Sequence, residues 1–231
     1  CSIVFELYLF VMKIGVIIAM DSEYKQMEEL LGGNSVGILG NNQIVLCQCG
    51  IGKVNAAVGT MNLINQHRPD CIISTGLAGG IDDVLSVGDV LVATESVYHD
   101  VWCGPGNDYG QIQGLPSRFK ADEYLLVHAD QLAHQDSYSC KMGLICTGDK
   151  FITSPQELTV IKSDFADGYA CDMESAAIAH VCHLLRVPFM SVRVISDTPG
   201  NTDDHQMQWE DFLATMSAQS FRWIRHFLQT L

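Results

Sequence analysis

Four charged residues stand at or near the ends of apolar runs, and their types suit acid–base chemistry. Glu23, Glu174 and Asp197 follow or end such runs, and Arg193 lies inside one. A buried Arg needs a carboxylate or a bound ligand as its partner. Burial and mutual repulsion push the pKa values of clustered carboxylates apart, so that one can donate a proton while another accepts one. We therefore expect an acid–base site.

Each of these features also has a purely structural explanation. Glu23 would open a helix, where the helix dipole favours a carboxylate, and Glu174 could cap the helix that follows it. Alternatively, an ionised Glu174 could accept hydrogen bonds from two neighbouring hydroxyl groups. The run Gly76–Gly80 is either a tight turn or a place where the backbone approaches a neutral ligand such as a sugar, because no Lys or Arg lies nearby to neutralise a phosphate.

Alternating apolar and amphipathic stretches would position these side chains. The pattern predicts strands over residues 13–19, 43–49, 71–75, 89–97, 140–147, 169–173 and 188–195, and helices over 23–31, 53–67, 123–133, 155–165, 174–185 and 209–231. Such alternation predicts an α/β fold, a single domain with a mixed, mostly parallel central sheet flanked by helices. Ligands bind at the carboxyl ends of the strands in such sheets, where the charged residues lie.

Composition narrows the class of protein. The chain has 231 residues, 48% of them hydrophobic, and 13 Lys and Arg against 27 Asp and Glu, which gives a formal net charge of −14. This length fits one domain, and the hydrophobic content excludes a disordered chain. The negative charge argues against a nucleic acid or an anionic membrane surface as the partner.

Nine cysteines, an odd number, are scattered through apolar runs, which predicts free thiols in a reducing cytoplasm. No C-x-x-C pair is present, which argues against a structural zinc site. His180 and His183 could share one helix face, but no further ligand stands at a useful spacing. We expect ordinary helix packing there and no metal.

The first residues are unusually apolar. The run that begins with residues 1–11 is long enough to cross a bilayer, but Glu6 and Lys13 interrupt it, and the part from Gly15 fits a buried parallel strand. It has neither the basic start nor the small-residue cleavage site of a signal peptide. We therefore expect the functional domain to comprise residues 12–231, preceded by an apolar extension.

Ten stretches, taken together and in order, resemble the purine nucleoside phosphorylase superfamily and, within it, the 5′-methylthioadenosine/S-adenosylhomocysteine nucleosidases. They are residues 12–23, 50–57, 75–80, 87–90, 98–100, 109–111, 119–122, 148–152, 172–179 and 192–197. The resemblance implies a cytoplasmic homodimer without a cofactor. It also implies hydrolysis of the N-glycosidic bond of an adenine nucleoside, which yields adenine and a 5-substituted ribose.

The resemblance also implies a role for each site residue. Asp197 would protonate the purine N7 as general acid, while Glu23 orients or deprotonates the attacking water with the help of Arg193. Glu174 would bind the ribose hydroxyls. The remaining expected substrate contacts are Met173 against the sugar, Phe151 and the Ile152 backbone at the base, Ser196 near the base, the glycine-run residues Leu77, Ala78 and Gly79, and Trp209 beside the 5′ substituent.

The sequence departs from the family pattern at Leu77, where these nucleosidases commonly carry a Ser that helps to hold the water, and at Trp209, which replaces a pocket Phe. The loop over residues 99–120, long enough to be functional, departs as well. Three alternatives follow: a phosphate-dependent phosphorylase, a nucleosidase for another 5′-modified nucleoside such as futalosine, or a nucleoside-binding sensor. Asp21 and Glu23 would repel phosphate, which favours water as the nucleophile.

Overall fold

The computed structural model describes residues 12–135, 139–198, 205–215 and 221–231. The expected apolar extension over residues 1–11 lies outside these ranges. Within them, no helix combines the length and the apolar character needed to cross a membrane.

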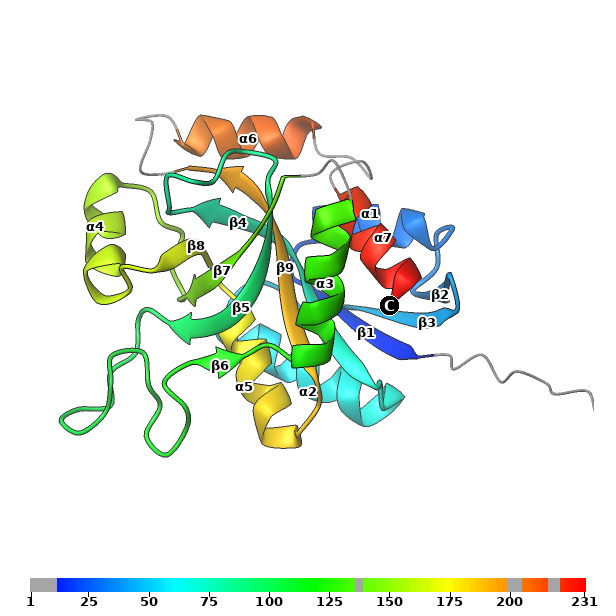
Figure 1. The fold of residues 1–231 in the computed structure, drawn as a ribbon, viewed down its shortest axis with the longest axis horizontal. Coiled ribbons are helices and arrows are strands. Elements are labelled where there is room, and N and C mark those ends of the chain that lie inside the picture. The colour runs from blue at the N-terminus through cyan, green and yellow to red at the C-terminus, as the bar shows by residue number, and fades with distance from the viewer. Residues whose placement is uncertain (1–11, 136–138, 199–204, 216–220) are drawn as a thin grey trace, which may run out of the picture.

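One mixed sheet forms the centre of the described molecule (Figure 1). Its strands are β1 (Lys13–Ile18), β2 (Val36–Leu39), β3 (Asn42–Gln48), β4 (Cys71–Gly80), β5 (Val90–Tyr98), β6 (Phe119–Lys120), β7 (Cys140–Thr147), β8 (Gly168–Asp172) and β9 (Phe189–Asp197). Five strand pairings are parallel and four are antiparallel. The predicted mixed, mostly parallel sheet is therefore confirmed.

Seven helices of the described chain surround this sheet (Figure 1). They are α1 (Asp21–Leu30), α2 (Lys53–His67), α3 (Glu123–Gln135), α4 (Pro155–Asp164), α5 (Ser175–Leu185), α6 (His205–Thr215) and α7 (Arg222–Thr230). Helices α2 and α5 lie together at the bottom of the view, α3 and α7 cover another face, and α6 crosses the top. The flanked sheet expected from the sequence is present.

Alternation along β1 explains why both faces of the sheet are covered. Successive side chains of a strand point to opposite faces. Val16 and Ile18 accordingly belong to the core that α1, α3 and α7 cover, whereas Ile17 between them packs in the core beneath α2 and α5. A strand buried on both faces reads as an unbroken apolar run, which is what residues 14–18 show.

Five strands close into a ring, a feature that the sequence pattern did not predict. Strand β4 pairs with β9 and β8, β5 pairs with β9 and β7, and β7 pairs with β8. Every strand of the ring contributes to one small apolar cluster, which consists of Ala78, Leu85, Leu91, Ala93, Ile145, Ala170 and Ile195. Alanines occupy three of these positions because a closed ring of few strands has a narrow interior.

Two predicted elements are wrong in ways that matter for the site. Strand β4 does not end at Thr75 but continues through the glycine run to Gly80, because β9 pairs with it along this length. The long closing helix over residues 209–231 is two helices, α6 and α7. The apolar face of α7 is buried in the core, while α6 lies across the top, and one straight helix could not do both (Figure 1). Strand β2 was not predicted.

Candidate active site

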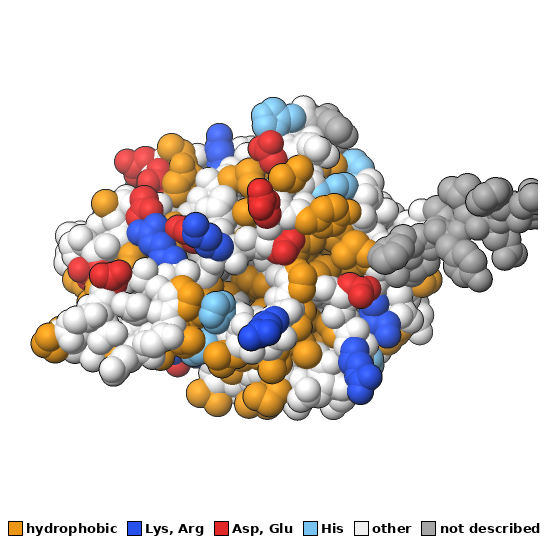
Figure 2. All heavy atoms as spheres, turned by 60° about the horizontal axis from the view of Figure 1, so that its bottom comes forward, with side chains coloured by type: hydrophobic (Ala, Val, Ile, Leu, Met, Phe, Trp, Pro, Cys, Tyr) orange, Lys and Arg blue, Asp and Glu red, His pale blue; other side chains and the backbone are white. Residues whose placement is uncertain are grey.

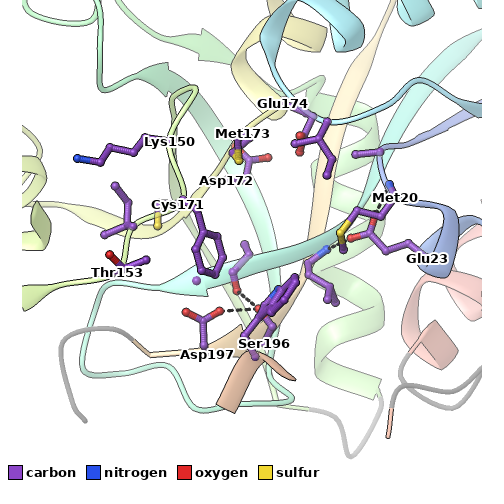
Figure 3. Close-up of a pocket in the computed structure, with 18 residues that line it drawn as sticks. Met20, Glu23, Lys150, Thr153, Cys171, Asp172, Met173, Glu174, Ser196 and Asp197 are labelled. Atoms are coloured by element: carbon purple, nitrogen blue, oxygen red, sulfur yellow. Dashed lines mark hydrogen bonds between the residues drawn. The ribbon is translucent and has the colours of Figure 1, made fainter. Parts of the chain in front are cut away.

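A cavity of about 440 Å³ opens where several strands of the sheet end (Figure 3). Eleven of the twelve residues expected at the site from the sequence line it: Glu23, Leu77, Ala78, Gly79, Phe151, Ile152, Met173, Glu174, Ser196, Asp197 and Trp209. The twelfth, Arg193, is only 1% exposed and lies behind the cavity wall. Residues separated by more than 170 positions are thus brought together; the roles given to them remain predictions.

The pairing of β4 with β9 sets the positions of two charged residues. The register places Arg193 opposite Gly76, and Asp197 opposite Gly79. A bulge between Ala78 and Gly79 shifts this register, and a bulge changes the direction of the side chains around it. Asp197, two residues beyond the strand predicted over residues 188–195, is therefore the last residue of β9, and strand pairing fixes its backbone.

Glu23 is held by two backbone donors. One carboxylate oxygen accepts a hydrogen bond from the Met20 N–H at 3.0 Å, and the other accepts one from the Leu77 N–H at 2.8 Å. Burial raises the pKa of Glu23, and the two N–H groups and the charge of Arg193 only partly oppose this. The hydrogen bond from Met20 places the Glu23 carboxylate at the start of α1, which agrees with the structural explanation. The same carboxylate lines the cavity, where its raised pKa makes it a stronger base.

Glycine at position 76 permits this arrangement. Its φ angle is +152°, and a Cβ atom there would lie 2.6 Å from Arg193 Nη1 and 2.7 Å from Glu23 Oε1. Any larger residue would displace one of these two side chains. The glycine run is thus not the tight turn considered from sequence: it is part of strand β4, and its missing side chains let charged groups approach its backbone.

Asp172 also lines the cavity and is a candidate site residue that was not expected from the sequence. Its carboxylate lies 2.7 Å from Arg193 Nη2, against 3.9 Å for the Glu174 carboxylate. Asp172 also accepts hydrogen bonds from the hydroxyls of Thr147 and Ser175, both at 2.6 Å. The expected carboxylate partner of Arg193 is therefore primarily Asp172. Its position beside Met173 and Glu174 at the end of β8 was the available signal.

Glu174 is buried and accepts a hydrogen bond from the Gly52 N–H at 2.9 Å. Burial, and next the neighbouring Asp172 carboxylate, raise the pKa of Glu174 to about 7. Its backbone stands at the N-cap of α5, but its side chain makes no capping hydrogen bond. The capping explanation thus fails, and the carboxylate is turned toward the cavity with Met173 beside it (Figure 3).

Asp197 faces the cavity from another side than Glu23 does (Figure 3). The Ser196 hydroxyl donates to Asp197 Oδ1 at 2.7 Å. Directly after it, the Thr198 N–H donates to the Gln208 side chain of α6 at 3.1 Å. Strand pairing and this bond to α6 together fix the acid at the end of β9.

The mouth of the cavity is aromatic. Phe151, 42% exposed, comes from the loop between β7 and α4, and its ring meets Trp209 of α6 edge to face at a centroid distance of 5.4 Å. Leu77 is buried and takes part in the core, and only its backbone N–H reaches Glu23. The two rings form an apolar clamp suited to a flat heterocycle or a thioether.

The charged lining of the cavity is dominated by carboxylates. Glu23, Asp172, Glu174 and Asp197 line it, whereas the one Lys among the described lining residues, Lys150, forms an ion pair with Glu157 and points away (Figure 3). Across the described ranges, no group of three or more His, Cys, Asp or Glu has the arrangement of a metal site. His180 instead hydrogen-bonds Tyr98 and stacks on Phe119.

The chain matches one family model, that of the Phosphorylase superfamily, over residues 13–229. Among curated proteins, it is 41% identical over 220 residues to the 5′-methylthioadenosine/S-adenosylhomocysteine nucleosidase of Actinobacillus succinogenes, which covers 90% of this chain and 95% of that protein. It is likewise 41% identical over 221 residues to the nucleosidase of the same name from a Geobacillus species, with 90% and 94% covered.

Solved structures agree with these relatives. The nucleosidase of Neisseria meningitidis, solved in complex with methylthio-immucillin-A, superposes with a TM-score of 0.89 at 34% identity and covers 96% of this chain and all of that one. The S-adenosylhomocysteine nucleosidase of Streptococcus pyogenes, solved with 5-methylthiotubericidin, gives a TM-score of 0.88 at 32% identity, with 97% and 99% covered.

Proposed function

The chain belongs to the phosphorylase superfamily, and we propose that it hydrolyses the N-glycosidic bond of 5′-methylthioadenosine and S-adenosylhomocysteine. The products are adenine and the 5-substituted ribose. Relatives of that name at 41% identity, and structures with nucleoside analogues bound, support this reaction. A close 5′-substituted adenosine falls within the same proposal.

One observation carries the choice of hydrolysis over phosphorolysis. Beside the expected position of the sugar stand Glu23 and Glu174, and the guanidinium nearest to them, Arg193, is already paired with Asp172. A phosphate dianion would have to bind next to these carboxylates without a free cation from the described lining, which Coulomb repulsion opposes. Water carries no such penalty.

In the proposed mechanism, Asp197 donates a proton to N7 of the purine, so that adenine leaves as a neutral base. The Ser196 hydroxyl supports the orientation of the Asp197 carboxyl. Glu23, whose pKa is raised by burial, takes a proton from the water that attacks the sugar. Positive charge develops on the ribose in this transition state, and the surrounding carboxylates stabilise it.

Binding of the two halves of the nucleoside is assigned to opposite ends of the cavity. Glu174 accepts hydrogen bonds from the ribose hydroxyls, and Met173 packs against the ring. Phe151 stacks on the base, and the backbone of Ile152 reads its edge. Trp209, which contacts Phe151, lies toward the 5′ substituent. One wall, with Glu174 and Met173, thus binds the ribose, and the opposing wall, with Phe151 and Ile152, binds the base.

We also propose that the protein is a homodimer. Val54, Val58 and Met61 form a stripe along α2 at helical spacing, and they are 74%, 55% and 49% exposed. Figure 2, which brings the bottom of the molecule forward, shows hydrophobic side chains gathered over this face. An apolar stripe of this kind is typical of a protein–protein interface. Sedimentation at micromolar concentration should give twice the chain mass.

A cytoplasmic location is part of the same proposal. The eight cysteines within the described ranges are unpaired, and Cys71, Cys146, Cys171 and Cys182 among them are buried. Free thiols of this kind persist in a reducing compartment. Cys103, in contrast, is exposed, so that an oxidising environment would leave it open to modification.

Product analysis tests the reaction. The protein is incubated with methylthioadenosine, with and without phosphate, and the products are separated. We expect adenine and free methylthioribose at a rate that does not depend on phosphate. A sugar 1-phosphate would mean a phosphorylase; tight binding without adenine release would mean a sensor. Turnover of futalosine in preference to both proposed substrates would reassign the 5′ group.

A further inference from the structure

Three charged residues form a group beside the cavity, outside its described lining: Lys53, Asp100 and Asp149. Lys53 Nζ donates to both carboxylate oxygens of Asp100 at 2.7 Å and lies 3.9 Å from an oxygen of Asp149. The Asp149 N–H donates to Asp100 at 2.9 Å. We name these three residues the Lys53 cluster.

The cluster caps helix α2 from a distant part of the chain. The first N–H groups of a helix have no partner within it, and the N-cap residue of α2, Gly52, has no side chain to supply one. Asp149 takes this part, because its Oδ1 accepts a hydrogen bond from the Lys53 N–H at 2.7 Å. A Cβ atom at Gly52 would lie 3.0 Å from that oxygen, so glycine keeps the approach open.

The same few residues connect the two ends of the cavity. The Gly52 N–H, next to the capped position, donates to Glu174. Asp149 stands two residues before Phe151 and three before Ile152, which is 5% exposed. The wall assigned to the sugar and the wall assigned to the base therefore meet in the Lys53 cluster.

Partial burial strengthens the cluster. The side chains of Lys53 and Asp100 are only 21% and 29% exposed. Burial by itself would raise the pKa of Asp100, but hydrogen bonds from Lys53 and the Asp149 N–H bring that pKa below its usual value. Asp100 therefore stays ionised at neutral pH. Lys53 Nζ also lies 5.4 Å from the centre of the Tyr98 ring, a cation–π distance.

We propose that the Lys53 cluster is a positioning device that fixes the separation between the base-binding segment 151–152 and the sugar-binding Glu174. This inference rests on the function proposed above. A nucleoside must contact both walls at once, so a loose wall has to be ordered when the substrate binds. Loss of the cluster therefore weakens substrate binding more than it slows the reaction of bound substrate.

The first test compares Lys53→Met with Lys53→Arg and with a control, Lys162→Met. Lys162 forms a similarly buried ion pair with Asp82, at 3.0 Å, away from the cavity lining. For Lys53→Met we expect KM for methylthioadenosine to rise about tenfold while kcat changes less than threefold. Lys53→Arg should return KM most of the way to the wild-type value, and Lys162→Met should leave KM unchanged. Equal KM values for the two Met variants, or no rescue by Arg, would overturn the inference.

The second test does not depend on turnover. Amide hydrogen exchange of residues 148–153, measured without substrate, should be at least tenfold faster in Lys53→Met than in Lys162→Met or the wild type. Unchanged exchange would refute the positioning role even if KM rose. A wild-type protein that releases no adenine would refute the proposed function, while the exchange measurement would still decide the inference.

Discussion

The floor and the mouth of the cavity are built by different means. The floor comprises the buried charged residues Asp172, Arg193 and Asp197. Asp172 and Arg193 contact each other and side chains from two further strands, β4 and β7, and from α5, and Asp197 accepts a hydrogen bond from Ser196. At the mouth, Phe151 is 42% exposed, and its described contact with Trp209 is one ring against another. Bond-breaking chemistry requires fixed charges, whereas recognition of a variable substituent tolerates an adjustable apolar surface.

The largest effect should come from the floor. Asp197→Asn keeps the shape of the side chain and its hydrogen bond from Ser196 but removes the proton donor. We expect kcat to fall by about 10³-fold with KM within threefold, because general acid catalysis contributes on the order of 10²–10⁴. Steady-state adenine release measures this, and the thermal midpoint should match that of the wild type. Full turnover in this variant would refute the assignment of the acid.

Glu174→Gln should lower activity but raise stability at neutral pH. Gln can still accept the Gly52 N–H, but it binds the ribose hydroxyls less well, so we expect kcat/KM to fall roughly 10- to 100-fold. For the wild type, kcat/KM should rise with pH as Glu174, whose pKa burial raises to about 7, becomes ionised. The variant should lose this rise near pH 7.

The effect of Glu174 on stability follows from the same pKa. A carboxyl whose pKa is higher in the folded than in the unfolded state holds its proton more tightly when folded. Well below pH 4.5 the carboxyl is protonated in both states. As the pH rises from 4.5 to about 7, the free energy of unfolding of the wild type falls by about 2–3 kcal/mol relative to that of Glu174→Gln, and above pH 7 the difference stays constant. Urea unfolding at pH 5 and pH 8 checks this. Glu157→Gln is the control for the activity measurement: Lys150 lowers the pKa of Glu157, so kcat/KM of this variant should keep the rise with pH that is expected for the wild type. A wild type that is the more stable protein at pH 8 would contradict the assignment.

The smallest effect should come from the mouth. Trp209→Ala removes the ring contact with Phe151, and an aromatic pair contributes about 0.5–1.5 kcal/mol beyond its buried area. We expect KM for methylthioadenosine to rise about three- to tenfold with little change in kcat. Met207→Ala, an exposed position on the same helix, is the matched control. A kcat loss as large as that of Asp197→Asn would erase the distinction between floor and mouth.

Much of the site could be predicted because it obeys a topological rule. Parallel strands bring their carboxyl ends to one edge of a sheet, so polar residues at those ends meet whatever the order of the strands. Glu23 and Asp197 follow this rule, because β1 and β9 both pair parallel with β4. Glu174 was expected from the same rule, but it follows β8, which pairs antiparallel with β4, and it reaches the cavity where the ends of these two strands meet. Asp172 was not expected, because the sequence around it does not indicate whether Arg193, 21 positions away, contacts Asp172 or Glu174.

Local signals failed where distant partners decided the outcome. Glycines weaken a strand, yet Gly76–Gly80 forms the second half of β4. This is because β9 supplies the hydrogen bonds and the Glu23 side chain needs the space. The predicted closing helix is two helices because the apolar residues of α7 pack in the core. Helical periodicity predicts an apolar face but not where the core lies. The Lys53 cluster joins positions 47 and 96 residues apart in the chain.

The sequence by itself determined the α/β class, most element positions, and three carboxylates with a buried Arg, since side-chain periodicity and burial are local properties of the chain. Only the tertiary structure decided the closure of five strands into a ring, the pairing of Arg193 with Asp172, and the capping of α2 by Asp149. Each of these depends on which distant segments meet, and that is fixed by the packing of the whole core rather than by the neighbours of any one residue.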